Sequence, residues 1–224
     1  MKFGVLVFPG SNCDRDVAYV TRELLGQSTR MVWHQETDIA DLDVIIVPGG
    51  FSYGDYLRCG AIARFSPVMQ QVVNHAQQGK FVLGICNGFQ VLTESGLLPG
   101  VLTRNRDLHF ICDRVPLQVE RTDTHWTQAY TTGETITLPI AHGEGRFYAD
   151  SATLSAIEDH GQVVFRYAGE NPNGSLNNIA GICNRQGNVL GMMPHPERAS
   201  DASLGCTDGL RLFQGLLEKI AALA

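Results

Sequence analysis

The residues best suited to chemistry in this chain are a cysteine, a histidine and a glutamate in two short motifs. Cys86 stands in the stretch Lys80–Gln90, KFVLGICNGFQ, with one glycine two positions before it and another two positions after it. A second motif, MMPHPER, places Glu197 two residues after His195. A thiol, an imidazole and a carboxylate can serve as nucleophile, general base and orienting group. Together these residues predict nucleophilic catalysis through a thiolate.

Cys86 lies where two elements of different character meet. The apolar run Phe81–Ile85 predicts a buried strand, and Gly88–Leu98 predicts a helix. Small residues on both sides permit the strained turn of a nucleophile elbow, G-x-[nucleophile]-x-G. At such a corner the helix dipole favours the thiolate, and the backbone N–H of Asn87 points toward a developing oxyanion. The spacing therefore predicts an activated thiol above the sheet.

The tetrapeptide Gly-Ile-Cys-Asn occurs twice, so it does not identify the nucleophile by itself. The second copy, Gly181–Asn184, is followed by a short polar stretch and then by the apolar run VLGMM. That order predicts a hairpin turn, with Cys183 as a small buried apolar residue. The six cysteines show no C-x-x-C spacing, and a chain of this size has enough core to need no disulfides. We therefore expect reduced thiols and a cytoplasmic protein.

Pro196 restricts the conformation of the candidate base. A residue before proline avoids helical geometry, so we expect His195 in an extended loop that follows the strand VLGMM. On an extended backbone residues i and i+2 share a face, which lets Glu197 reach the imidazole. Two alternatives remain open: a surface turn with an incidental ion pair, and a metal site that adds His142 and Glu144. We expect no metal, because the usual zinc-ligand spacings are missing.

The elements that must position these residues alternate along the first half of the chain. Apolar strand-like runs alternate with amphipathic helical runs, which predicts βαβ units and a mostly parallel sheet covered by helices on both faces. From Val101 to about Tyr148, segments such as VPLQVER are typical of antiparallel strands. A helix over Ser151–Gly161 and a closing amphipathic helix follow. No repeat or linker interrupts residues 1–224, so we expect a single α/β domain.

Charge and hydropathy argue against two classes of partner. The net charge is −6, and no run of Lys and Arg exceeds two residues, so there is no footprint for nucleic acid. The amino-terminal stretch MKFGVLVFPG has an apolar run too short for a signal-peptide core or a membrane span. It predicts a first buried strand. We therefore expect neither nucleic acid nor a membrane as a partner.

Several motifs together resemble a known enzyme family. GICNGFQ, followed much later by PHPE, resembles the class I, or triad, glutamine amidotransferases, whose usual elbow reads G-x-C-x-G-x-Q. FPGSNCDRD, PGGFSYGDYLRCGAIAR, AHGEGRF and NPNGS narrow the resemblance to the glutamine amidotransferase subunits of phosphoribosylformylglycinamidine synthases, over nearly the whole chain. The resemblance implies a flavodoxin-like α/β fold with an antiparallel extension.

The resemblance also implies an activity and partners. It indicates a glutaminase that passes ammonia to a large ATP-dependent synthetase subunit, which converts formylglycinamide ribonucleotide to its amidine in de novo purine synthesis. A small third subunit usually joins that complex. Neither a P-loop nor a dinucleotide-binding glycine pattern occurs in this chain. ATP and Mg²⁺ would therefore be used by the partner, and we expect no cofactor in this chain.

Roles for the motif residues follow from the same resemblance. Cys86 would be the nucleophile, His195 the acid and base, and Glu197 the carboxylate that orients it. Gly50 would offer a second oxyanion-hole N–H, although Pro-Gly-Gly after a strand is by default a tight turn.

Asn87 would supply the first oxyanion-hole N–H, and Gln90 matches the elbow position that contacts bound glutamine. The motif HGEG, His142–Gly145, could line the glutamine pocket or form a simple loop. Two other functions remain open. One is a stress-response hydrolase with a flavodoxin-like fold and an elbow cysteine, a family that lacks a late Pro-His-Pro-Glu. The other is a catalytically silent regulatory subunit, which would not need an intact Cys, His and Glu.

Overall fold

A large mixed sheet forms the centre of the molecule. The computed structural model describes residues 1–221 and the side chains of residues 1–218. Nine strands lie in the order β2-β1-β3-β4-β11-β10-β9-β6-β7, and a separate two-stranded sheet pairs β5 with β8. The strands are β1 (Lys2–Val7), β2 (Ser28–Trp33), β3 (Val44–Val47), β4 (Phe81–Ile85), β5 (Val101–Thr103), β6 (Ile111–Val119), β7 (Thr135–His142), β8 (Arg146–Tyr148), β9 (Val163–Tyr167), β10 (Ile179–Cys183) and β11 (Val189–Met192). The α-helices are α1 (Asp14–Tyr19), α2 (Pro67–Gln77), α3 (Asn87–Glu94), α4 (Ser151–Asp159) and α5 (Leu210–Ala221).

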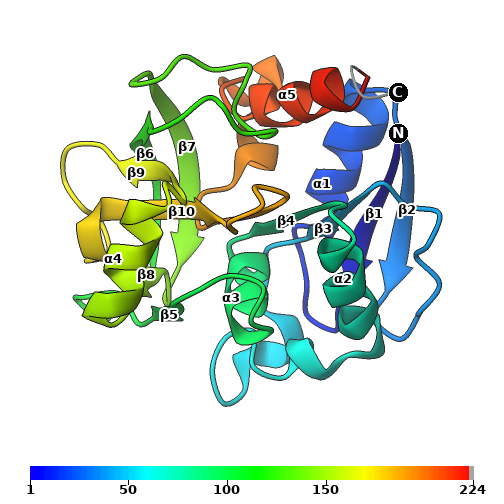
Figure 1. Cartoon of the computed structure of the whole chain (residues 1–224), viewed down its shortest axis with the longest axis horizontal. Helices are drawn as coiled ribbons and strands as arrows, with labels where there is room; N and C mark the ends of the chain where they lie inside the picture. The colour runs from blue at the N-terminus through cyan, green and yellow to red at the C-terminus, as the bar shows by residue number, and fades with distance from the viewer. Residues whose placement is uncertain (222–224) are drawn as a thin grey trace.

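The part of the sheet from β2 to β11 is parallel, as the alternation of runs predicts. Every residue of β3 is buried, and β11 is buried throughout. Helices α1 and α5 lie on one face of the sheet and α2 and α3 on the other (Figure 1). A strand that is covered on both faces has no polar side, so its sequence reads as a continuous apolar run.

Beyond β11 the sheet becomes antiparallel. β11 pairs in parallel with β4 and antiparallel with β10, and β9, β6 and β7 continue the antiparallel order. In β7 the buried side chains of Ile136, Leu138 and Ile140 alternate with more exposed ones. This alternation arises because successive side chains point to opposite faces of a strand. The predicted antiparallel extension is confirmed.

Helix α3 is shorter than the sequence predicts. The helical pattern runs to Leu98, but α3 ends at Glu94. Gly96 follows with φ 73°, and its N–H donates to the carbonyl of Thr93 at 3.1 Å. A glycine in the left-handed region just past a helix satisfies the last carbonyls and ends the helix. Leu98 is still buried, so its apolar character reflects packing beyond the helix end.

Two further features concern the helices and the cysteines. Within residues 1–221, no helix is both long and apolar enough to cross a bilayer. All six cysteines are free. Cys183 ends β10, directly before the turn that leads into β11, and it is buried as the hairpin pattern predicts.

Candidate active site

Cys86 occupies the corner between β4 and α3. Its backbone has φ 49° and ψ −105°, a conformation that residues other than glycine rarely adopt. The flanking glycines permit the close packing that this turn needs. A Cβ atom on Gly88 would lie 1.9 Å from the carbonyl oxygen of Val47, and one on Gly84 would lie 2.8 Å from the carbonyl carbon of Gly88. Strain of this kind is concentrated at functional sites.

The candidate base and its carboxylate form a buried pair. Nδ1 of His195 donates to Oε1 of Glu197 at 2.6 Å, and both side chains are almost fully buried. The N–H of His195 donates to the carbonyl of Pro139 in β7 at 2.8 Å, which fixes the backbone of the loop. The Glu197 carboxylate therefore sets both the orientation and the tautomer of the imidazole.

The loop around this pair is only partly extended, which corrects the sequence-based expectation. His195 itself is non-helical, with φ −103° and ψ 90°. Pro196–Ala199 is a short 3-10 helical turn, so Glu197 lies on a helical turn rather than on an extended backbone. Proline restricts the residue before it but is itself compatible with the first position of a helix. The pair therefore forms across the start of the turn.

Cys86 and His195 face one small cavity of about 180 Å³. The Sγ atom of Cys86 lies 3.7 Å from the carbonyl oxygen of Ala141 at the end of β7. Nε2 of His195 is buried and has no hydrogen-bond partner among the described residues, so it can interact with a bound substrate. The complete lining of the cavity consists of Asn12, Cys13, Gly50, Phe51, Cys86, Phe110, Ala141, His195 and Arg198.

The parallel strands explain why these residues meet. Cys86 follows β4, His195 follows β11, and Gly50 follows β3, and these three strands are neighbours in the sheet. The carboxyl ends of parallel strands share one edge of a sheet, where open α/β sheets bind their ligands. Residues far apart in the sequence are thereby brought to one cavity.

Opposing effects act on the imidazole. Burial by itself would lower the pKa of His195, but the Glu197 carboxylate and the neighbouring thiols Cys86 and Cys13 raise it well above its usual value. The raised pKa favours the imidazolium over a wide pH range. An imidazolium beside the cavity can give a proton to a leaving group.

Gly50 reaches the cavity as the oxyanion assignment requires. Its φ is 140°, and a Cβ atom there would lie 2.7 Å from the backbone nitrogen of Asn12. Asn87 is the first residue of α3, where backbone N–H groups have no acceptor within the helix. Its side chain is engaged elsewhere, because Oδ1 accepts from the N–H of Ser52 at 3.2 Å. The oxyanion-hole roles of both residues stay predictions.

The side chain of Gln90 is not free to contact a substrate in this structure. It is buried, and its amide Nε2 donates to the carbonyl of Glu144 at 2.6 Å while its Oε1 accepts from Nδ2 of Asn87 at 2.9 Å. Both ends of the amide are therefore bonded within the protein, and Gln90 is not among the residues that line the cavity. Its contact with glutamine stays a prediction. In this structure it joins the elbow helix to the HGEG turn, His142–Gly145.

The sequence reasoning missed Cys13 as a neighbour of the catalytic pair. Its Sγ, a nitrogen of His195 and an oxygen of Glu197 all lie within 4.8 Å of one another. Arg198 donates to the same sulfur at 3.1 Å and to Asp16 at 3.1 Å. Burial raises the pKa of Cys13 above its usual value and outweighs the opposing effects of His195 and Arg198, so it stays a thiol.

No spacing rule could have found Cys13, although it lies in the motif FPGSNCDRD. The group Cys13, His195 and Glu197 is the one set of His, Cys and acidic side chains in the described part of the chain whose atoms could hold a metal. The alternative set with His142 and Glu144 is not assembled there. The expected absence of a metal stays a prediction.

Comparisons with known proteins identify the family of the chain. The sequence model of the CobB/CobQ-like glutamine amidotransferase domain matches residues 1–205. A curated protein of Trichormus variabilis, phosphoribosylformylglycinamidine synthase subunit PurQ, is 86% identical over 224 residues, with 100% of both chains covered. A protein of the same name from Gloeobacter violaceus is 67% identical over 231 residues, again with 100% of both covered.

A solved structure extends the comparison to three dimensions. The chain is similar to one in the structure of PurLQS from Thermotoga maritima, with 45% identity, a TM-score of 0.89 and coverage of 98% of each chain. At this identity the agreement includes the sequence as well as the fold. The chain therefore belongs to the family of CobB/CobQ-like glutamine amidotransferases.

Proposed function

We propose that this chain is the glutaminase subunit of a phosphoribosylformylglycinamidine synthase and acts in de novo purine biosynthesis. The observation that carries the proposal is the convergence of Cys86 and His195 on one cavity beside a strained corner, with Glu197 bonded to the imidazole. The full-length similarity to proteins with that name supports the same function.

The partners follow from the proposed function. A large synthetase subunit receives the ammonia and uses ATP and Mg²⁺ to form the amidine, and a small third subunit completes the complex. The solved PurLQS structure supports such a partnership, because its similar chain covers 98% of this one. This chain itself uses no cofactor and acts in the cytoplasm.

The reaction begins at the cavity. The thiolate of Cys86 attacks the carboxamide carbon of glutamine, and the oxygen of the tetrahedral intermediate becomes negative. The backbone N–H groups of Gly50 and Asn87 stabilise that oxygen. Fixed donors of this type act without reorganisation during the reaction.

His195 transfers the protons in both steps of the reaction. Its imidazolium gives a proton to the leaving nitrogen, so the C–N bond breaks and ammonia departs from a thioester on Cys86. The neutral imidazole then takes a proton from water, whose oxygen attacks the thioester carbon and releases glutamate and the thiol. Glu197 keeps Nε2 of His195 directed at the cavity throughout, because Nδ1 is bound to the carboxylate.

The test is the variant Cys86→Ala in the assembled synthase. Amidine formation from glutamine should fall to background, because the covalent route needs the sulfur, whereas amidine formation from added ammonia should continue. Cys183→Ala, at the other buried Gly-Ile-Cys-Asn, is the matched control and should keep both activities. Amidine formation from glutamine by the Cys86→Ala enzyme would refute the proposal.

A covalent label gives a second measurement. A diazo-ketone analogue of glutamine should modify Cys86 stoichiometrically in the wild-type chain, with glutamine giving protection. A silent regulatory subunit would not be labelled. A hydrolase of another specificity would be labelled without protection by glutamine.

A further inference from the structure

Asn105, two residues after β5, has a buried side chain whose amide forms hydrogen bonds at every donor and acceptor site. Its Nδ2 donates to the carbonyls of His109 and His142, each at 2.8 Å. Its Oδ1 accepts from the N–H of Gly145 at 3.0 Å and from Nδ1 of His142 at 3.1 Å. An amide has two donors and two acceptor sites, so this one is saturated. Asn105 is 1% exposed.

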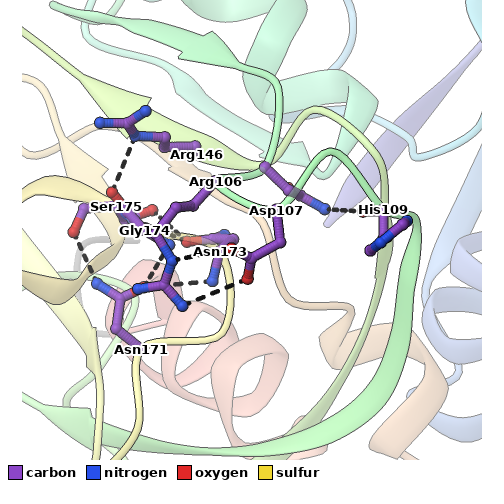
Figure 2. Close-up of polar contacts among 9 residues, drawn as sticks. Arg106, Asp107, His109, Arg146, Asn171, Asn173, Gly174 and Ser175 are labelled. Atoms are coloured by element: carbon purple, nitrogen blue, oxygen red, sulfur yellow. Dashed lines mark hydrogen bonds and ion pairs between the residues drawn. The ribbon is translucent and has the colours of Figure 1, made fainter.

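Most of these bonds hold the HGEG turn. The backbone N–H of Asn105 also donates to the carbonyl of Gly143 at 2.9 Å. A second buried amide, Asn173, donates to the carbonyl of Gly145 at 2.8 Å from the other side. Figure 2 shows the outer part of this assembly, where Arg106 and Asp107 lie beside the loop that carries Asn173. The N–H of Arg106 donates to the carbonyl of Asn173 at 2.9 Å, which ties the two loops together.

The turn held in this way adjoins a residue that lines the reaction cavity. It directly follows Ala141, whose carbonyl lies 3.7 Å from the sulfur of Cys86. The carbonyl of Glu144 in the turn accepts from Gln90 of the elbow helix at 2.6 Å. Asn105 also holds the carbonyl of His109, next to Phe110, and both Phe110 and Ala141 line the cavity. The amide of Asn105 therefore connects the Phe110 wall of the cavity to the Ala141 wall. Through the HGEG turn it is also linked to Gln90 of the elbow helix.

Asn105 also determines which nitrogen of His142 carries the proton. Oδ1 of Asn105 can only accept, so Nδ1 of His142 must be the donor and Nε2 is left with a free lone pair. Nε2 is buried and has no hydrogen-bond partner among the described residues. Burial and the nearby His195 lower the pKa of His142 to about 4, so the ring is neutral near pH 7. No second imidazolium forms beside the catalytic one.

We propose that Asn105 is a positioning residue for the reaction with glutamine: it holds the HGEG turn, the neutral tautomer of His142 and the Phe110 wall in the arrangement that accepts the substrate. The inference rests on the proposed glutaminase function. It adds a residue that lies outside the motifs of the sequence analysis and touches neither the thiol nor the cavity. Its effect is transmitted through His142, Gly145 and the carbonyl of His109.

The test variant is Asn105→Asp in the assembled synthase. The carboxylate has the same shape but cannot donate, so the bonds to the carbonyls of His109 and His142 are lost and a negative oxygen faces both carbonyl oxygens. We expect the KM for glutamine to rise by about tenfold or more, with a smaller fall in kcat. Amidine formation from added ammonia should stay at the wild-type rate.

Asn188→Asp is the matched control. Asn188 is an equally buried amide whose Nδ2 donates to the carbonyls of Ala76 and Lys80, each at 2.8 Å. It precedes β11, at the opposite end of that strand from His195. The control should lose a comparable amount of stability to urea and keep the wild-type KM for glutamine. If Asn105 had a structural role alone, the two variants would have the same KM for glutamine.

A milder variant covers the case in which Asn105→Asp does not fold. Asn105→Ser retains a hydroxyl that can donate one bond, and circular dichroism will establish that it is folded. It should show a smaller rise in KM than the Asp variant. A folded Asn105→Ser or Asn105→Asp protein with a wild-type KM, or an equal rise in Asn188→Asp, would overturn the inference. If the wild-type complex does not use glutamine at all, the proposed function fails instead.

Discussion

At the scale of single residues, Cys86 and His195 are defined by what surrounds them. Other cysteines are as deeply buried as Cys86, but Cys86 combines a positive φ, a place at the cavity and an imidazole beside it. His195 and His142 likewise differ in the groups that surround each imidazole. The Glu197 carboxylate raises the pKa of His195 despite burial, whereas burial and the nearby His195 lower the pKa of His142 to about 4. Identical residue types therefore acquire opposite protonation states.

The pH dependence of glutamine use tests the His195 and Glu197 pair. Burial lowers the pKa of His195 and the carboxylate raises it, so Glu197→Gln removes the largest raising effect and the pKa falls. The imidazolium is the proton donor, so activity is lost as the pH rises through this pKa. The alkaline limb of kcat/KM for glutamine should therefore move to lower pH. Turnover should fall about a hundredfold or more, but less than in His195→Ala.

Glu94→Gln is the control for that measurement. Glu94 is also a buried carboxylate, but it pairs with Arg58 and Arg64 at the end of α3. Its replacement should leave the pH profile unchanged. An alkaline limb that stays in place in Glu197→Gln would contradict the assigned role of the carboxylate.

At the scale of elements, the close contact of α3 with β3 and β4 shapes the elbow. The contact leaves no room for a side chain at Gly88, where the oxygen of Val47 lies 1.9 Å from the site of a Cβ atom. The helix dipole and the first N–H groups of α3 are thereby brought directly above the strand ends. The glycine spacing of the motif is thus a packing requirement as well as a conformational one.

Gly88→Ala should separate α3 from β3. The added methyl group meets backbone atoms that cannot rotate away, so we expect a loss of about 1–3 kcal/mol in the free energy of unfolding and a large loss of glutaminase activity. Urea denaturation gives the first quantity. Gly215→Ala in α5 is the control, because the nearest atom lies at 3.4 Å and alanine favours a helix interior. Equal stability of the two variants would count against this account of the elbow.

At the scale of the whole molecule, one sheet carries both the elbow and the wall opposite it. The parallel strands bring Cys86 and His195 to their carboxyl ends, and β7 supplies Ala141 from the antiparallel end of the same sheet. Among the described residues, β7 pairs with a single strand of the sheet, β6. On its other side the backbone of β7 meets the active site, through the carbonyls of Pro139 and Ala141.

The proposed complex predicts that glutaminase activity depends on assembly. Hydrolysis by the free chain would release ammonia into solvent, so a subunit that serves a partner is expected to be slow alone. Addition of the synthetase and the small subunit should raise the rate of glutamate formation about tenfold or more, a typical coupling between sites. Cys86→Ala protein serves as the blank in this assay. Equal rates with and without the partners would refute the expectation.

Features that depend on neighbours along the chain can be predicted from the sequence. The glycine spacing around Cys86, the pair His195 and Glu197, and the change from continuous to alternating apolar runs are all local patterns. Local geometry follows from such patterns, so the corner, the parallel and antiparallel parts of the sheet and the buried hairpin cysteine could be predicted. The partly helical turn at Pro196 could not, because proline is compatible with both conformations.

Contacts between groups that are distant in the sequence depend on the folded chain. Cys13 reaches His195, Gln90 bonds to the HGEG turn, and Asn105 saturates its amide on His109, His142 and Gly145. An asparagine after a strand gives no periodic signal, because its partners are backbone groups that every residue carries. Hydrogen bonding at long range depends on where the sheet places each loop. The candidate catalytic groups can therefore be found from the sequence, whereas the side chains that hold them in place become visible only in the folded chain.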